Sequence, residues 1–504
     1  MEEGHFVKSL VWMLVIFTCL MKYKCEECPL RCSCSSIEGS DSGPRLVACV
    51  GVFPSSLPRT IEELVITDAN MSSLTADDVV PLGKLSSLHI TSSCILRIAE
   101  DAFAGDNLVN LTDLRLSNNE IDTLGVKTFV TLLHVEELFL DGNNIRSVSG
   151  VLSHLTRLQV LHLENNYLEE IPNDLPQSLT TLFLNNNNIH TVSFLGLSYA
   201  SLLHLDLCEN SFARLSHRNI SIPKGLNTLC LGNQFYDIDP KIFTSKNNSL
   251  ERLVLKTTKK LTAYSLDAIN IFHELKSLTI SGAKVSKLPD WAFKILPKLE
   301  SLSLINMKCA PAIGDDFFSF KLLTELDLSG SPEITRTVLS NQEFLENLPY
   351  LKTLKLRDTS ISEINDDLMP ILQILEQLDI SNNDLTCDCN LNNIIQQSRS
   401  GKLLLVSPEM TRCFSESVQQ TYLVFDKRLR FNCNKTGDRG QKSLDDDISS
   451  TNNEVSCPST MNGLHYTIIC LIILITVLLI IIFHLLVKYL KVLRWKRCTV
   501  STIF

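Results

Sequence analysis

Apolar residues recur along the chain in a short unit whose most regular copies lie between residues 111 and 212. Five copies read LTDLRLSNNEI, VEELFLDGNNI, LQVLHLENNYL, LTTLFLNNNNI and LLHLDLCENSF, and they begin at Leu111, Val135, Leu158, Leu179 and Leu202. The first, fourth, sixth and eleventh places are apolar, and the ninth place is Asn119, Asn143, Asn166, Asn187 or Asn210. Because side chains alternate along a strand, the fourth and sixth places face the same side. Each unit therefore predicts a short strand with one buried face.

The ninth-place Asn marks a tight turn, where its amide can satisfy backbone groups that the turn leaves without partners. One unit cannot bury its own apolar residues, so neighbouring units must stack. Fourteen units fit between Ile61 and Leu385, and their mean period of about 24 residues is typical of leucine-rich repeats. We therefore predict an α/β leucine-rich repeat solenoid, a horseshoe with a parallel sheet on its concave face.

Most units after Leu226 lack the ninth-place Asn. That place holds Thr258, Ala283, Met307, Ser331 or Thr359, and the last unit regains its amide at Asn383. Without the amide, the turn lacks its usual backbone partner. We expect strand spacing and curvature to change across these units.

Cysteines gather at both ends of the repeats, at Cys28, Cys32, Cys34 and Cys49 and at Cys387, Cys389, Cys413 and Cys433. The first group could be a metal knuckle, but ahead of an apolar repeat array it fits a disulfide cap better. The spacing leaves the connectivity open. Cys208 and Cys230 share a face but are offset by two residues, so a bridge between them would require local distortion. Cys94 and Cys309 are expected to be buried thiols.

The remaining segments indicate membrane topology. Residues 466–487 contain no charge and are long enough to cross a bilayer, and basic residues follow them. We expect a plasma-membrane protein with an extracellular N-terminus and a cytoplasmic C-terminus. An uncleaved anchor is the alternative to a signal peptide at the apolar run 9–21. The predicted order is signal peptide 1–24, cap 25–60, repeats 61–385, cap 386–433, stalk 434–465, transmembrane helix 466–487 and tail 488–504.

Aromatic side chains mark a candidate binding site. The fifth place, between the buried leucines, holds Phe139, His162 and Phe183 in three consecutive units. Acidic residues flank them at Glu136, Glu137, Asp141, Glu164, Asp206 and Glu209. An aromatic row with an acidic border favours a basic or polar partner, although single exposed apolar groups are ordinary on any surface. The later basic residues Lys352, Lys355 and Arg357 are more typical of a solvated face.

Common catalytic and nucleotide-binding motifs are missing from the sequence, so we predict no enzyme, cofactor or metal site. A net charge of −10 argues against nucleic acid as the main partner. Five sequons predict glycosylation, and the partner is expected to bind away from Asn70, Asn110, Asn219, Asn247 and Asn434.

The caps, the irregular repeats and the single span make residues 25–490 resemble Toll-like receptor ectodomains, and the Asn-poor units resemble those of the lipopeptide-recognising subgroup. The resemblance to extracellular leucine-rich repeat proteins implies the disulfides Cys28–Cys34, Cys32–Cys49, Cys387–Cys413 and Cys389–Cys433. Toll-like receptors continue into a cytosolic TIR domain, which this sequence does not contain. The resemblance therefore implies a co-receptor, a decoy or a presenter.

Its partners would be an extracellular protein or a microbial ligand, together with a full-length receptor or a second copy of the chain. The alternative is a cell-adhesion or synaptic-organiser protein, which uses the same caps, solenoid and span.

Overall fold

The structure is a computed structural model that divides the chain into two compact units, residues 1–431 and 432–504. It describes residues 28–35, 44–79, 82–105, 108–190, 200–212, 223, 225–233, 249–257, 260–261, 268–285, 296–307, 320–341, 348–416, 419–429, 431 and 433. The predicted signal peptide 1–24, stalk 434–465, transmembrane helix 466–487 and tail 488–504 lie outside these residues. So do Asn219, Asn247, Cys309 and Asn434. Within the described ranges, no helix is long and apolar enough to cross a membrane.

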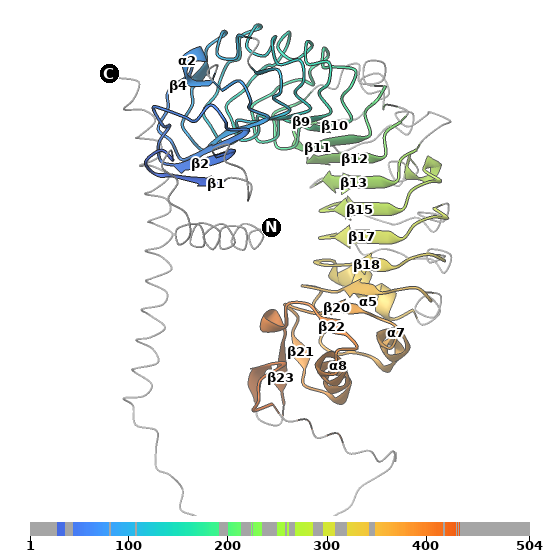
Figure 1. The fold of residues 1–504 in the computed structure, drawn as a ribbon. Coiled ribbons are helices and arrows are strands. Elements are labelled where there is room, and N and C mark those ends of the chain that lie inside the picture. Colours follow the sequence, from blue (N-terminus) through green and yellow to red (C-terminus); the bar gives the residue numbers. More distant parts are fainter. Residues whose placement is uncertain are drawn as a thin grey trace, which may run out of the picture. The chain divides into compact units, whose positions relative to one another are not determined.

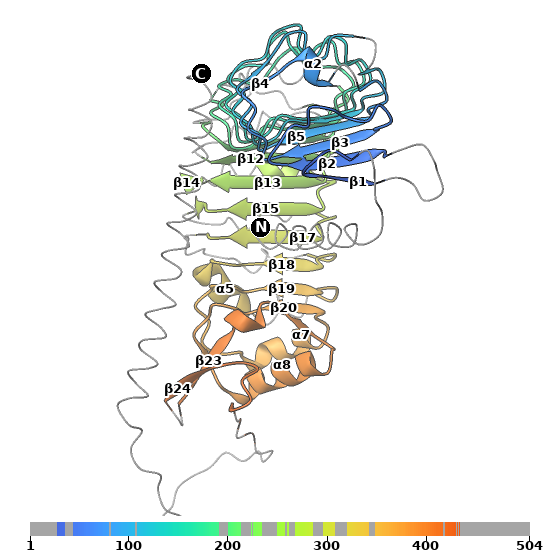
Figure 2. The same cartoon turned by 60° about the vertical axis from the view of Figure 1, so that its left-hand side comes forward.

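One large sheet carries a strand from every predicted repeat, and Figures 1 and 2 show the strands side by side. All neighbours in the array pair in parallel, which confirms the predicted parallel solenoid; its curvature stays a prediction. The repeat strands are β3 (Glu63–Thr67), β5 (Ser87–Thr91), β7 (Asp113–Arg115), β8 (Glu137–Phe139), β9 (Val160–His162), β10 (Thr181–Phe183), β11 (His204–Asn210), β12 (Thr228–Asn233), β13 (Arg252–Thr257), β15 (Ser277–Ser281), β17 (Ser301–Ile305), β18 (Glu325–Asp327), β19 (Thr353–Lys355) and β20 (Gln377–Asp379).

Side-chain alternation places the core on one face of this sheet. In β7 to β10 the middle residue is buried and its two neighbours are half-buried. The fourth-place and sixth-place leucines, such as Leu114 and Leu116, are fully buried. Each buried leucine contributes about 1.5–3 kcal/mol relative to an exposed one. The third, fifth and seventh places are left on the outward face of the sheet.

Short elements close the remaining sides of the repeats. The paired strands β4 (Ser73–Leu74) and β6 (Arg97–Ile98), and β14 (Lys260–Leu261) and β16 (Lys284–Val285), are parallel. The described helices in the repeats are α2 (Ala76–Val79), α5 (Pro332–Leu339) and α7 (Met369–Leu372), with 3₁₀ turns η3 (Ala268–Ile271) and η5 (Asp366–Leu368).

The ninth-place asparagines link each turn to the next, as predicted. Asn143 Oδ1 accepts the Ile121 N–H at 3.1 Å, and its amide donates to the carbonyls of Leu116 and Leu140, each at 3.0 Å. Because the Ile121 N–H and the Leu116 carbonyl belong to the preceding unit, one side chain joins two repeats.

The eighth place has a left-handed backbone whether or not Asn follows it. Its φ is 56° at Asn118 and 65° at Gly142, and also 54° at Asn306 and 68° at Gly330, which precede ninth places without Asn. Asn and Gly adopt this conformation at low cost. This turn therefore recurs in most units, with or without Asn. Asn233 and Thr257, at the eighth places of the units that begin at Leu226 and Leu250, instead end the strands β12 and β13.

A hydroxyl replaces the amide in some of the Asn-poor units. Ser331 Oγ accepts the Met307 N–H at 2.9 Å and donates to the Leu304 carbonyl at 2.7 Å. The prediction that these turns lose their backbone partner is thus wrong at Ser331. The hydroxyl has one hydrogen to donate where the amide has two.

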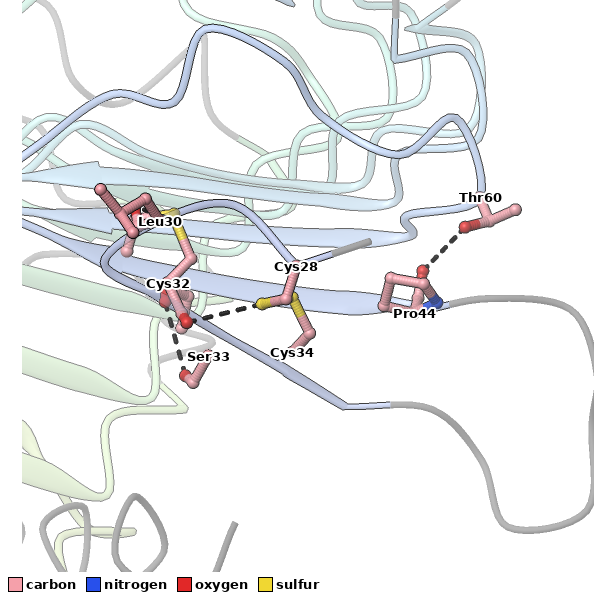
Figure 3. Close-up of a disulfide and its surroundings, with 9 residues drawn as sticks. Cys28, Leu30, Cys32, Ser33, Cys34, Pro44 and Thr60 are labelled. Atoms are coloured by element: carbon pink, nitrogen blue, oxygen red, sulfur yellow. Dashed lines mark hydrogen bonds between the residues drawn. A yellow bond between two sulfur atoms is a disulfide. The ribbon is translucent and has the colours of Figure 1, made fainter. Parts of the chain in front are cut away.

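The N-terminal cap has an antiparallel strand pair, β1 (Cys32–Ser35) and β2 (Leu46–Val50), and β2 continues in parallel to β3. Cys28 is bonded to Cys34 and Cys32 to Cys49, the pairs that the resemblance implies. Figure 3 shows this cluster, together with the Thr60 hydroxyl that donates to the Pro44 carbonyl at 2.9 Å. These bonds hold the cap together, and the parallel pairing of β2 with β3 joins it to the first repeat.

The C-terminal cap holds the helix α8 (Cys389–Arg399), whose first turn begins with the Asp388 carboxylate accepting the Leu391 N–H. Cys387 is bonded to Cys413. Cys389 and Cys433 are each disulfide-bonded as well, and their mutual pairing stays a prediction. The other cap elements are β21 (Leu385–Thr386), β22 (Leu404–Leu405), η6 (Pro408–Met410), β23 (Arg412–Ser415) and β24 (Gln420–Leu423).

Two other cysteines in the repeats form a bridge. Cys208 and Cys230 are bonded, with their Cα atoms 5.3 Å apart. The register between β11 and β12 shifts after Leu207, which is the local distortion that the offset required. The expectation for Cys94 is wrong, because it is disulfide-bonded rather than a thiol.

Replacing Asn143 by Ala should destabilise the fold. The buried Ile121 N–H would lose its acceptor, whereas the two carbonyls would keep donors from Asn119 and Asn166. One unsatisfied buried group costs about 1–3 kcal/mol. Chemical denaturation should show this loss, and Asn144→Ala, which removes only a 3.4 Å bond to the Glu120 carbonyl, should change stability little. Equal stability of the two variants would contradict the role of the ninth place.

Candidate binding surface on the outward face of the sheet

The parallel register places the fifth-place residues of successive units in one line. His89, Arg115, Phe139, His162, Phe183 and Asp206 are consecutive partners across β5 to β11. These side chains point away from the leucine core, since they alternate with buried residues. The sequence-predicted aromatics are thus brought together on neighbouring strands.

Phe139, His162 and Phe183 form a continuous stack, which we call the aromatic row. Ring centroids are 4.2 Å apart between Phe139 and His162 and 4.4 Å apart between His162 and Phe183, with interplanar angles of 11° and 21°. Strands about 4.8 Å apart impose this spacing. His204, from the third place of β11, lies 4.9 Å from Phe183 with its ring tilted by 52°. The rings therefore cover one another's faces.

Arg115 covers the other face of Phe139, with the guanidinium carbon 4.1 Å from the ring centroid. Two carboxylates hold the guanidinium: Asp113 lies 3.0 Å from Nε, and Glu137 lies 3.5 Å from a terminal nitrogen. A cation over a ring face contributes about 0.5–2 kcal/mol. The sequence interpretation missed Arg115, although it occupies the same fifth place one unit earlier.

Neighbouring groups offset the cost of burying the Asp113 carboxylate. Burial alone would raise its pKa, but the hydrogen bonds and charges of His89 and Arg115 outweigh burial and hold the pKa of Asp113 below its ordinary value of 3.8. His89 Nε2 lies 3.0 Å from an Asp113 oxygen. At this end of the row, Arg115 of the chain itself pairs with the carboxylates.

An acidic border is made of Asp141 and Glu164, at the seventh places beside the row, and of Asp206, at the fifth place next to Phe183. His162 Nδ1 lies 2.9 Å from Glu164 Oε1. Glu164 Oε2 is buried and has no hydrogen-bond partner. Asp141 accepts a bond from the Ser117 hydroxyl, and Asp206 accepts one from the Cys208 N–H. Within the described residues, no Lys or Arg forms an ion pair with these three carboxylates.

The pKa values of Asp141 and Asp206 are both shifted upwards, and burial is the largest cause. Burial raises the pKa of Asp141; the Ser117 hydrogen bond opposes this shift, and the charge of Glu164 adds to it. Burial also raises the pKa of Asp206. The Cys208 N–H and the charges of His204 and Lys256 oppose this shift, and the charge of Glu164 adds to it. Burial lowers the pKa of the neighbouring His204, although the charge of Asp206 opposes this. Within the described residues, the border thus carries negative charge that no ion pair with Lys or Arg neutralises.

Asp206, Cys208 and Cys230 lie close enough together to suggest metal ligands. The two sulfurs are joined in a disulfide and hold no thiolate for a metal. This group is therefore structural.

The basic residues of the last repeats are largely neutralised. Lys355 lies 2.6 Å from Glu325, and Lys352 lies 2.8 Å from Glu376. Burial alone would lower the pKa of Lys355, but the bond to Glu325 raises it overall. These pairs favour a solvated face over a basic binding patch.

The two described sequons avoid the aromatic row. Asn70 and Asn110 are both exposed. Asn70 follows β3 and Asn110 precedes β7, so both lie outside the line of fifth-place residues. Glycans at these positions would leave that line accessible.

Comparisons with known proteins agree with the architecture. The leucine rich repeat family pattern matches residues 109–168. Human lumican is 30% identical over 264 residues, which cover 51% of this chain and 68% of lumican. Mouse osteomodulin is 30% identical over 225 residues, covering 44% of this chain and 46% of osteomodulin, so the match spans about half of that relative.

Toll-like receptors also match in part. Bovine Toll-like receptor 3 is 27% identical over 320 residues, covering 61% of this chain and 30% of the receptor. A solved leucine-rich repeat protein of Leptospira interrogans has 22% identity and a TM-score of 0.47, over 69% of this chain and 80% of its own. The lumican match is sufficient to assign the family, because it has 30% identity and covers 68% of lumican. The chain therefore belongs to the leucine-rich repeat family, as an extracellular member with cysteine caps.

Proposed function

We propose that this chain is a cell-surface receptor or co-receptor that binds an extracellular protein or a microbial ligand through the aromatic row and the acidic border. The partial match to a Toll-like receptor supports a role in innate immune recognition. The single observation that carries the proposal is the stack of Phe139, His162 and Phe183 on the outward face.

The stack has the properties of a binding site rather than of a core. The buried leucines already form the hydrophobic core, so the fold does not require aromatics at outward places. Stacked rings have few conformations left to lose, which lowers the entropic cost of binding. Aromatic side chains also dominate interface energetics. An adhesion protein would use the same face, so the identity of the partner separates the two functions.

Replacing Phe139 and Phe183 together by Ala should abolish most partner binding. Truncating an interface hot spot costs about 2 kcal/mol or more, so if the aromatic row is the binding site the double variant should bind well over tenfold more weakly. The purified full-length chain, immobilised by a C-terminal tag, would be screened against extracellular proteins and microbial lipopeptides. Surface plasmon resonance would then compare the variants.

A matched control is Tyr350→Ala with Ile374→Ala, which removes exposed apolar groups in later repeats. This control should keep wild-type affinity, and both double variants should keep the wild-type fold by circular dichroism. The Phe139 and Phe183 variant loses the ring stack and the Arg115 contact, so its unfolding midpoint should fall. Wild-type affinity in the Phe139 and Phe183 variant would move the site elsewhere. One such place is the pocket of about 700 Å³ lined by Asp384, Arg412 and Phe414.

Asp141→Asn should stabilise the protein near pH 7. The pKa of Asp141 is raised in the folded chain, so its negative charge destabilises the fold wherever the carboxylate is ionised. Replacing it with Asn removes this penalty. The gain should fade as pH falls through the folded pKa towards the unfolded value of about 3.9, because the wild-type carboxyl then becomes neutral. Thermal unfolding midpoints between neutral and acidic pH would measure the effect.

Asp113→Asn should change the stability of the fold in the opposite direction. Its folded pKa is lowered, so the charged carboxylate stabilises the fold above the unfolded pKa. The variant should be less stable than wild type at neutral pH, and the difference should disappear as pH falls through the folded pKa. A stability loss for Asp141→Asn at neutral pH would show that its charge is compensated.

A further inference from the structure

Neighbouring side chains cover the faces of the rings in the aromatic row. His162 lies between Phe139 and Phe183. Arg115 covers the outer face of Phe139, and His204 lies against Phe183. An approaching group therefore meets the outer edges of the rings. Ring edges carry partial positive charge and attract the negative face of another aromatic ring. The row of edges thus favours an aromatic side chain as its apolar partner.

One nitrogen without a partner lies along this row of edges. The His162 side chain points away from the core, so the ring atoms farthest from its Cβ, which are Cε1 and Nε2, form its outer edge. Nδ1 lies 2.9 Å from Glu164 Oε1, whereas Nε2 forms no hydrogen bond with any residue that the structure describes. The side chain is 18% exposed. Because both of its faces are covered, this exposed area belongs to the outer edge.

The contact with Glu164 determines the role of Nε2. An ionised carboxylate only accepts hydrogen bonds, so the proton in this contact comes from Nδ1. In a neutral imidazole the other nitrogen then has no proton and accepts a hydrogen bond. Neutral His162 therefore presents a hydrogen-bond acceptor in the middle of the row, with the edges of Phe139 and Phe183 on either side.

We infer that the aromatic row binds a tyrosine side chain of a protein partner, whose hydroxyl donates to His162 Nε2 while its ring packs against the edge of Phe139 or Phe183. This inference rests on the proposed function of the row. Tyrosine combines the aromatic ring that the edges favour with a donor at the end of that ring. A phenylalanine in its place would leave Nε2 without a donor. Tyrosine is also enriched among the residues that dominate interface energetics.

The test uses three fluorescent pentapeptides of alternating glycine and a variable residue: tyrosine, O-methyltyrosine or phenylalanine. O-methyltyrosine keeps the ring and its oxygen but has no proton to donate. At pH 8 the tyrosine hydroxyl keeps its proton. Fluorescence anisotropy with the purified full-length chain at this pH should show the tyrosine peptide binding about fivefold more tightly than either of the other two, the effect of one hydrogen bond.

Variants locate the interaction. His162→Phe keeps a ring in the stack but removes Nε2, so tyrosine-peptide affinity should fall about fivefold, to that of the O-methyltyrosine peptide. Its unfolding midpoint should also fall, because Glu164 loses its partner. His154→Phe makes the same change at an exposed histidine of the preceding loop, and it should leave all three affinities unchanged. Circular dichroism would confirm that both variants fold. If His162→Phe does not fold, the comparison of tyrosine and O-methyltyrosine peptides on the wild-type chain still decides the inference.

Three results would overturn the inference: equal binding of the tyrosine and O-methyltyrosine peptides, unchanged tyrosine-peptide affinity in folded His162→Phe, or no tyrosine-peptide binding at millimolar concentration. The proposed function would survive each of them, provided that Phe139→Ala with Phe183→Ala still weakens binding of the partner found in the screen. If that double variant binds the screened partner at wild-type affinity, the proposed function fails with the inference.

Discussion

The hydrogen bonds made at the turn after each strand hold the array together, because they connect one unit to the next where the backbone leaves the sheet. Asn143 joins its own turn to that of the preceding unit, and Ser331 does so with a hydroxyl. Stacked leucines supply the hydrophobic free energy but do not fix the height of one unit above another. The turn bonds and the strand ladder fix this height, and every outward side chain inherits the resulting spacing.

The aromatic row is a direct product of that spacing. Two strands in parallel register place equivalent side chains close to the centroid separation of stacked aromatic rings, so Phe139, His162 and Phe183 stack without any special backbone feature. The same register places Asp141 and Glu164 in neighbouring units, on one side of the row. In a repeat array, residues at equivalent places of successive units therefore lie next to one another on the surface. The contact is favourable for the rings and unfavourable for the carboxylates.

The repeat pattern predicted the parallel sheet, the buried leucines and the line of aromatics, because each depends only on strand alternation and a fixed period. It did not predict the role of Arg115 over Phe139, which depends on the rotamer of a long side chain. Nor did it predict that Cys94 is disulfide-bonded, since a lone cysteine in a repeat carries no signal of its mate. For Cys208 and Cys230 the sequence indicated only that a bridge would require a distortion, and the register does shift after Leu207.

That bridge makes one junction of the array different from its neighbours. The junctions on either side of it are joined by hydrogen bonds and packing in the described residues, whereas β11 and β12 also share a covalent link. Under tension along the stacking direction, hydrogen-bonded junctions can separate one after another, but this junction cannot open without breaking a chemical bond. The disulfide lies immediately beyond Phe183 and Asp206, so the strand that borders the aromatic row is clamped against mechanical separation from the strand that follows it.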